Sequence, residues 1–207
     1  KTNLVLPTVY YMVNMPNPFR SIGKVARTLL QAPALLRAEA QDRRIFNEML
    51  FSAYTGVSED RILLLADEVV ENVLEPALFK GSKELVAQCK AAGHDVVLVS
   101  GALDVHMRPF AKLIGADDVI ANRLEFKDGY ATGKLMRPVV AGPEKAVLIR
   151  DDAKRRGHAL EECFAFSDSY SDVPMLSVVG HPSAVNPDAK LERLAKGYSW
   201  PLIPLSR

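Results

Sequence analysis

Short apolar runs alternate with helical segments from about residue 80 onward. The run over 95–99 is apolar after its first residue, as in a strand buried on both faces of a parallel sheet. Helical patterns over 82–92 and 104–114 flank this run and end at Gly93 and Gly115. Strands and helices that alternate with short connections predict an α/β layer built on a mainly parallel sheet.

The same alternation continues to about residue 186. Residues 123–126 and 130–136 flank Lys127-Asp128-Gly129, and an Asp-Gly pair between two strands predicts a hairpin. The other expected elements are strands over 119–121, 164–166 and 183–186 and helices over 143–156 and 175–179.

The first 76 residues have a different character. Apolar residues recur at helical spacing over 22–30 and 35–51, and Ser58-Glu59-Asp60 is typical of a helix start. No stretch there has a convincing strand pattern. A chain of 207 residues corresponds to about 1.4 average domains. We therefore expect two parts, a helical part over 1–76 and an α/β part over 77–207.

Charge and cysteine content limit the partners and the compartment. Lys plus Arg number 26 and Asp plus Glu number 25, so the formal net charge is only +1 and we expect no nucleic-acid partner. The apolar runs are far shorter than the roughly 18 residues of a membrane span. Two cysteines, Cys89 and Cys163, are too few for a disulfide scaffold, which favours a reducing, cytoplasmic setting.

The beginning of the helical part is basic. We expect a solvated or phosphate-attracting surface there and no membrane contact, with a membrane-surface helix as the alternative. The basic residues are Arg20, Lys24, Arg27 and Arg37.

Two segments combine a polar side chain with the end of a strand or the start of a helix. Ser100 follows a buried strand, and Gly101 allows close approach of the backbone, which together suit a small anion site. Lys145 falls in the first turn of a helix, where the dipole disfavours a cation unless an anion is bound there. Taken alone, the first segment is better explained as a Ser-Gly turn that leaves a strand, and the second as a solvated surface lysine.

The segment from Phe164 to Met175 is the sharpest feature of the sequence. A buried strand ends in Asp168, and Asp172 follows four residues later, just before a helix start that contains proline. Two carboxylates that converge repel one another unless a cation lies between them, and Mg²⁺ suits one or two carboxylates plus phosphate oxygens. The alternative for Asp172 is a simple helix cap.

Ligands of open α/β sheets bind beyond the carboxyl ends of the strands. Ser100, Lys145 and Asp168 are all expected at that edge. A hydroxyl, a cation and a metal-binding carboxylate around one point indicate phosphoryl chemistry.

These residues resemble three ordered motifs of the haloacid dehalogenase superfamily. Ser100-Gly101, Lys145 and the segment 167–172 match its second, third and fourth motifs, and the pattern Ala121-Asn122-Arg123-Leu124, Asp128-Gly129, Thr132-Gly133 is typical of its phosphoserine-phosphatase-like branch. The resemblance implies a Rossmann-like core with an inserted helical cap. It also implies Mg²⁺-dependent hydrolysis of a small phosphorylated metabolite through an aspartyl-phosphate intermediate.

The resemblance also implies a role for each site residue. Ser100 and Gly101 would bind the transferring phosphoryl group, and Lys145 would neutralise both the phosphate and the nucleophile. Asp168 would ligate Mg²⁺, and Asp172 would support the metal and its waters. Ser171 departs from the family pattern, because phosphoserine phosphatases usually have Asn there.

The first motif of the superfamily, Asp-x-Asp-x-Thr after a central strand, does not occur in this sequence. Residues 1–5 resemble the stretch that follows it, so we expect the strand and the nucleophile just upstream of Lys1. We expect residues 1–207 alone to be inactive. Two alternatives stay open, a phosphate-binding or interaction protein without catalysis and a phosphotransferase that uses an acceptor other than water.

Overall fold

The computed structural model of the protein describes residues 4–14, 30, 32–39 and 41–206. The helix expected over 22–30 lies outside the described residues except for Leu30, as do Arg20, Lys24 and Arg27. Among the described residues, no helix is both long enough and apolar enough to cross a membrane.

Helices make up the described residues of the N-terminal part, as the sequence predicts. Asp42 begins α3, where its side chain accepts a hydrogen bond from the Arg44 amide at 2.7 Å. Ser58 caps α4 in the same way, accepting from the Arg61 amide at 3.4 Å. The helices are α1 (Val5–Val13), a helical segment over 32–39, α3 (Arg43–Phe51), α4 (Glu59–Leu64) and α5 (Ala66–Val69), followed by the π-helical turn η2 (Val70–Leu74).

Strands and helices alternate in the C-terminal part, which confirms the predicted α/β class. In chain order the elements are α6 (Ser82–Ala91), β1 (Val97–Leu103), α7 (Asp104–Ile114), β2 (Asp118–Asn122), β3 (Leu124–Lys127), β4 (Tyr130–Leu135), α8 (Pro143–Arg156), β5 (Phe164–Ser167), α9 (Val173–Leu176), β6 (His181–Val185), α10 (Ala189–Gly197) and β7 (Leu202–Ile203). The hairpin β3–β4 is antiparallel, whereas the β1–β2, β5–β6 and β6–β7 pairs are parallel.

Several boundaries differ from those expected. β1 begins at Val97 and continues to Leu103, but its regular pairing with β2 ends at Ser100, after which the register shifts. Helix α9 begins at Val173 because Pro174 suits its first turn. Helix α10 and strand β7 were not expected from the sequence. The clearest signal for α10 is Asp188, whose side chain caps its first turn.

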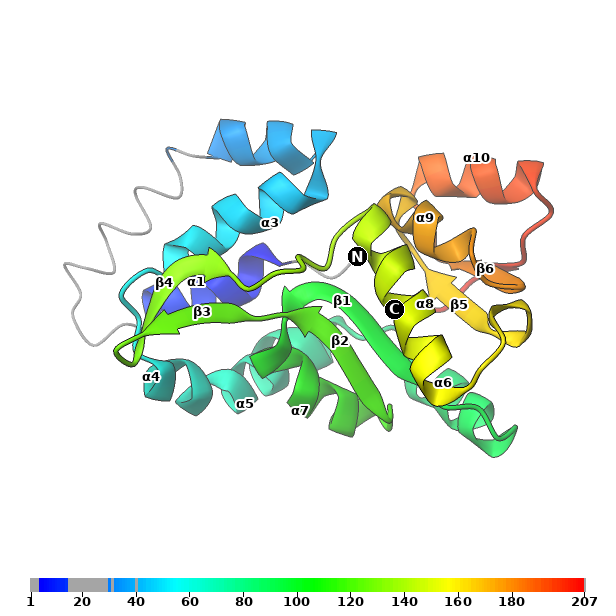
Figure 1. Cartoon of the computed structure of the whole chain (residues 1–207), viewed down its shortest axis with the longest axis horizontal. Helices are drawn as coiled ribbons and strands as arrows, with labels where there is room; N and C mark the ends of the chain where they lie inside the picture. The colour runs from blue at the N-terminus through cyan, green and yellow to red at the C-terminus, as the bar shows by residue number, and fades with distance from the viewer. Residues whose placement is uncertain (1–3, 15–29, 31, 40, 207) are drawn as a thin grey trace.

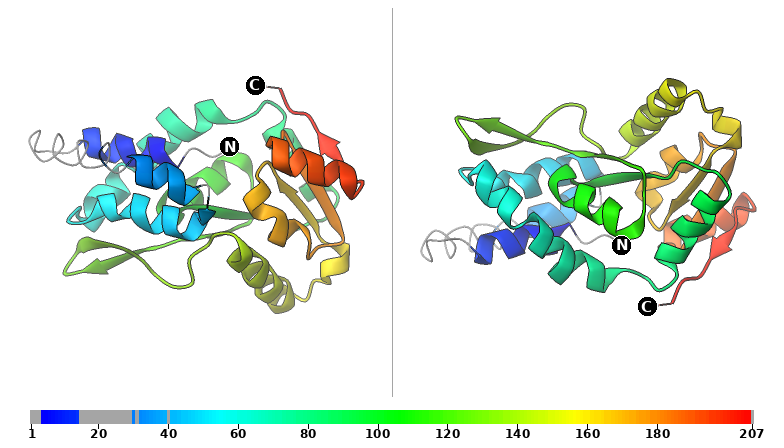
Figure 2. Two further views of the ribbon diagram at one scale, coloured as in Figure 1. Left: turned by 90° about the horizontal axis from the view of Figure 1, so that it is seen from above. Right: turned by 90° about the horizontal axis from the view of Figure 1, so that it is seen from below.

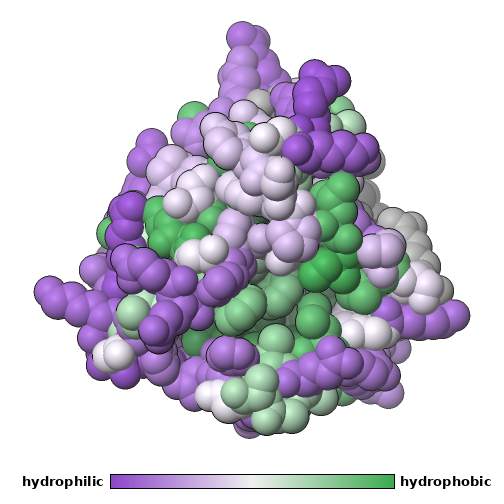
Figure 3. Space-filling view, turned by 90° about the vertical axis from the view of Figure 1, so that its right-hand side faces the viewer, coloured by the Kyte–Doolittle hydropathy of each residue, from purple (hydrophilic) through white to green (hydrophobic). Residues whose placement is uncertain are grey.

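The parallel sheet is in two parts. β1 pairs only with β2, and β5 pairs only with β6 on one edge, so within the described chain no strand joins β1 to β5 (Figure 1). A cavity of about 800 Å³ lies between them, lined by residues 97–99 of β1 and 164–167 of β5. Figure 3 shows the side of the molecule that lies at the right in Figure 1, where an apolar hollow is ringed by hydrophilic residues. We call the cavity between β1 and β5 the interstrand slot.

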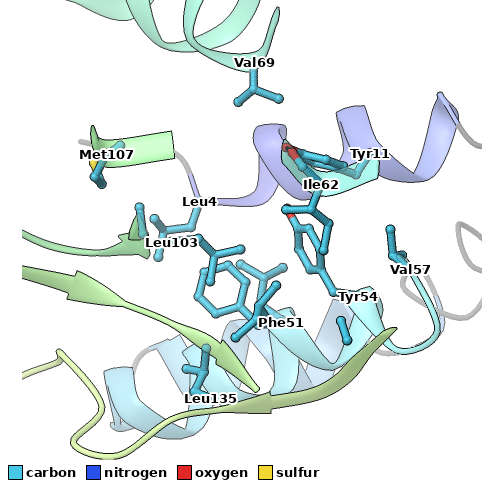
Figure 4. Packing of buried hydrophobic residues seen from close by; sticks show 14 of the residues in the cluster. Leu4, Tyr11, Phe51, Tyr54, Val57, Ile62, Val69, Leu103, Met107 and Leu135 are labelled. Carbon is cyan, nitrogen blue, oxygen red and sulfur yellow. Dashed lines mark hydrogen bonds between the residues drawn. The ribbon is translucent and has the colours of Figure 1, made fainter. Parts of the chain in front are cut away.

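Two apolar clusters hold the elements together. The larger one combines the helical part with β1, α7 and the hairpin, through residues such as Phe51, Leu103, Met107 and Leu135 (Figure 4). The smaller one joins β5, β6, α9 and α10 at the other end of the molecule (Figure 2). The domain boundary expected at residue 76 stays a prediction. The larger cluster contains residues from both sides of it. This packing fixes α3 beside the end of β1.

Candidate active site

A pocket of about 200 Å³ lies where β1 and β5 end. It brings together all five residues that the sequence analysis selected, which are Ser100, Gly101, Lys145, Asp168 and Asp172. They come from three segments of the chain, and only the packing of the two sheets and α8 places them around one space.

Ser100 and Gly101 form the wall of the pocket on the β1 side. The Ser100 hydroxyl accepts a hydrogen bond from the Ala102 amide at 3.1 Å, which orients its oxygen. The Gly101 carbonyl accepts from Asn122 Nδ2 at 2.7 Å and, more weakly, from Asn47 Nδ2 at 3.4 Å. A Cβ at position 101 would lie 3.0 Å from Asn47 Nδ2 and 3.3 Å from the Val140 carbonyl oxygen, so a larger residue would press on α3 and on the loop before α8.

Lys145 enters the pocket from the first turn of α8, after Gly142 and Pro143. The residue is only 8% exposed, which excludes the alternative of a solvated surface lysine. Its Nζ lies 2.8 Å from Asp172 Oδ1, and both side chains are nearly buried. A buried cation needs such a partner because desolvation costs several kcal/mol per ion.

Asp172 holds the lysine rather than capping a helix. It precedes α9, but its side chain makes no capping hydrogen bond. One carboxylate oxygen pairs with Lys145, and the other accepts from the Ser167 hydroxyl at 2.8 Å. The two contacts fix the carboxylate at the pocket wall and set the position of the lysine head group.

Asp168 directly follows β5 and is half-buried at the pocket. Its carbonyl accepts from the Asp188 amide at 2.8 Å, and Asp188 also accepts from the Tyr170 amide at 2.8 Å. Asp188 thus ties the loop after β5 to the start of α10, which holds the backbone of Asp168 in place.

Three further polar residues at this site were not expected from the sequence. Asn122 is fully buried at the end of β2 and bonds both Gly101 and Val140, so it joins β1 to the loop before α8. Arg43 and Asn47 reach the pocket from α3. An amide side chain at the end of a short apolar strand is the available sequence signal for Asn122, whereas nothing in the sequence places α3 over β1.

The donor set fits a hard divalent cation. Asp168 and Asp172 supply carboxylate oxygens at one pocket, and Mg²⁺ takes one or two carboxylates together with water and phosphate oxygens. Across the described ranges, no group of three or more His, Cys, Asp or Glu side chains is arranged to hold a metal ion. Further ligands would therefore come from substrate, water or other parts of the protein.

Comparisons with known proteins identify the family of the chain. A family model for haloacid dehalogenase-like hydrolases matches residues 8–177. A probable phosphatase of Mycobacterium tuberculosis is 38% identical over 143 residues, which are 69% of this chain and 50% of that protein. A phosphoserine phosphatase of Streptococcus thermophilus is 33% identical over 144 residues, 69% of this chain and 67% of that protein.

The fold has a counterpart among solved structures. The crystal structure of a Bordetella pertussis protein of unknown function aligns with a TM-score of 0.81 and 21% identity, covering 98% of this chain and 91% of the other. The chain spans about half the length of the first curated relatives that it matches. With its α/β fold and the pocket around Ser100, Lys145 and Asp168, the chain belongs to the haloacid dehalogenase-like hydrolase family, in its phosphoserine-phosphatase-like branch.

Proposed function

We propose that the protein is a Mg²⁺-dependent hydrolase of a small phosphorylated metabolite. The observation that carries this proposal is the single pocket that gathers a strand-end hydroxyl, a buried lysine and two carboxylates. Phosphoryl transfer needs positioning and neutralisation of charge on the phosphate oxygens, and these groups supply both. The named relatives, a probable phosphatase and a phosphoserine phosphatase, support the same reaction class.

Each residue has a role in this proposal. Ser100 and the backbone at Gly101 bind the phosphoryl oxygens, and Lys145, held by Asp172, stabilises their negative charge. Asp168 and Asp172 would hold Mg²⁺, which when bound supplies charge neutralisation for the phosphate. Because Asp172 already pairs with Lys145, its carboxylate would contact both the lysine ammonium group and the bound Mg²⁺.

The nucleophile would come from a segment ahead of Lys1 that enters the interstrand slot. Four residues line both the slot and the active-site pocket, namely Val99, Phe166, Ser167 and Asp168. A strand that fills the slot would therefore end at the pocket. A carboxylate at its end would attack phosphorus and release the alcohol, and water would then cleave the acyl phosphate to give phosphate and the free carboxylate.

The test compares two aspartates in the chain extended by the residues encoded ahead of Lys1. We expect Asp168→Asn to raise the Mg²⁺ concentration needed for half-maximal turnover far more than Asp172→Asn does, because Asp168 directly ends the strand, where a metal ligand is held rigidly. Asp172→Asn should lower turnover at saturating Mg²⁺, because it leaves the buried Lys145 without its carboxylate partner. Turnover of a panel of phosphomonoesters against Mg²⁺ concentration measures this. Small, equal effects of both substitutions would contradict the metal assignment.

Residues 1–207 alone should bind phosphate weakly and turn over no phosphomonoester. Robust Mg²⁺-dependent hydrolysis by a preparation shown by mass to begin at Lys1 would overturn the proposed nucleophile. An encoded sequence with no aspartate ahead of Lys1 would instead favour a phosphate-binding protein without catalysis.

A further inference from the structure

Asn47 stands out among the polar groups at the active-site pocket. It lies on α3 in the helical part, lines the pocket and is 1% exposed. Its Nδ2 lies 3.4 Å from the Gly101 carbonyl, whereas its Oδ1 is buried and has no hydrogen-bond partner in the structure as described. Such an unpaired buried acceptor destabilises the protein unless something completes its hydrogen bonding.

The orientation of this amide is set by its neighbour. A carbonyl oxygen only accepts hydrogen bonds, so the nitrogen of Asn47, not the oxygen, must face Gly101. The oxygen is left for a different partner, and that partner must be a donor. Exchanging the two atoms would bring two acceptors together at Gly101 and leave the amide nitrogen without its bond.

The surrounding wall is polar and belongs to the helical part. Arg43 is four residues earlier on α3, on the same face of the helix, and also lines the pocket. Its guanidinium is held at 2.8 Å from Glu39 and over the Phe46 ring, which gives it a fixed place. The proposed phosphoryl-binding groups Ser100, Gly101 and Lys145 belong to the α/β part, whereas α3 lines the same pocket from the helical part. We therefore assign α3 to the group that the phosphate is attached to.

Resting on the proposed phosphatase function, we propose that Asn47 is a specificity residue that accepts a hydrogen bond from the alcohol part of the substrate. The substrate is then a phosphomonoester with a hydroxyl or ammonium donor close to its phosphate. An ester that lacks a donor leaves Oδ1 unpaired in a filled pocket, and sites with unpaired buried polar groups discriminate strongly against such analogues.

The test measures binding rather than turnover, so that it is independent of the proposed reaction. Calorimetry with the N-terminally extended chain and Mg²⁺ compares three phosphonates of equal chain length, whose C–P bond cannot be hydrolysed by this chemistry. They are 3-hydroxypropylphosphonate, 3-aminopropylphosphonate and butylphosphonate. We expect the two donor-bearing compounds to bind at least about tenfold more tightly than butylphosphonate.

Two substitutions separate the two functions of the amide. Asn47→Leu removes the acceptor and should bring the three dissociation constants to within about twofold of one another. Asn47→Asp keeps an acceptor oxygen but places a second acceptor against the Gly101 carbonyl. It should weaken binding of all three compounds while keeping the preference for the donor-bearing ones, most strongly for the ammonium compound. Arg44→Ala, on the exposed side of the same helix, is the matched control and should leave all three constants unchanged.

Each outcome decides the inference. Equal binding of the three compounds by the unsubstituted protein, or a preference that persists in a folded Asn47→Leu variant, would overturn it. A larger effect for the hydroxyl or the ammonium compound identifies which donor the substrate carries. Absence of hydrolysis in a separate assay would refute the proposed reaction without changing the binding comparison.

Discussion

At the scale of single residues, burial determines which polar groups need partners. Lys145 and Asp172 form one nearly buried ion pair, supported by the Ser167 hydroxyl.

His106 is a second buried polar group that needs a partner. It lies on α7, away from the pocket, and is 1% exposed. Its Nε2 lies 3.2 Å from the Tyr11 hydroxyl, which itself donates to the Ile62 carbonyl at 2.6 Å. Since that hydroxyl proton is committed, Nε2 must carry a proton and donate, which fixes a neutral tautomer.

His106 should make stability depend on pH. Burial lowers the pKa of His106 to about 3 from its usual 6.5. Between pH 3 and pH 6.5 the unfolded chain binds a proton at His106 that the folded chain does not bind. His106 therefore does not weaken the folded state above about pH 6.5, but the free energy of unfolding falls as the pH is lowered from 6.5 toward 3. Urea unfolding between pH 4 and 7 should show a shallower loss of stability for His106→Gln, which keeps a donor for Tyr11. The carboxylates are the same in both proteins, so they contribute equally to the two pH dependences. If the unfolding free energies of the two proteins fell in parallel with pH, His106 would not be the group responsible.

At the scale of elements, the β3–β4 hairpin connects the two parts of the chain. Its turn residues Asp128 and Gly129 have φ of 53° and 77°, as the Asp-Gly pair predicts. The hairpin then packs on the loop of the helical part, where the Gly56 amide donates to the Ala131 carbonyl at 2.8 Å. Gly133, with φ of 81°, lies against this loop as well.

The glycines of this hairpin offer a matched pair. A Cβ at Gly129 would meet nothing within 4 Å, so Gly129→Ala should cost only the backbone strain, about 1 kcal/mol of unfolding free energy. A Cβ at Gly133 would lie 2.0 Å from Thr55 Oγ1 and 3.0 Å from the Ser52 carbonyl oxygen. Gly133→Ala should therefore cost about 3 kcal/mol by chemical denaturation. Equal costs for both variants would show that the hairpin does not pack on this loop in solution.

At the scale of the whole molecule, the two parts of the parallel sheet are held by packing and not by strand pairing. β1 and β5 each have an edge without a strand partner in the described chain, and the interstrand slot lies between these edges. Unpaired strand edges and an apolar cavity both disfavour the folded state. A strand that fills the slot would remove both.

Extending the chain ahead of Lys1 should therefore change hydrogen exchange in two specific strands. We expect stronger protection of amides in β1 and β5, with smaller changes in β2 and β6, because only the first two strands border the slot. Hydrogen-exchange mass spectrometry of residues 1–207 and of the extended chain measures this, and thermal unfolding should show a higher Tm. Uniform protection across all strands would indicate general stabilisation and would contradict insertion into the slot.

Local chemistry in the sequence was sufficient for much of the fold. The helix bounds Asp104–Ile114 and Pro143–Arg156 were predicted in full, because glycines end both helices and Pro143 begins the second. The hairpin followed from its Asp-Gly turn. The candidate residues Ser100, Lys145 and Asp168 could be selected because the sequence pattern places each at the end of a strand or at the start of a helix. In the structure Ser100 is the last regularly paired residue of β1, which continues to Leu103.

Only the tertiary structure determined the environments of those residues. That Lys145 is buried against Asp172, and that Asp172 does not cap α9, depend on contacts between segments far apart in the chain. The placement of Asn47 against Gly101 also depends on packing, in this case of α3 against β1. Local patterns record turn, cap and strand preferences, which act over a few residues. Burial and pairing at the active-site pocket arise from long-range apolar packing, which leaves no local signature in the sequence.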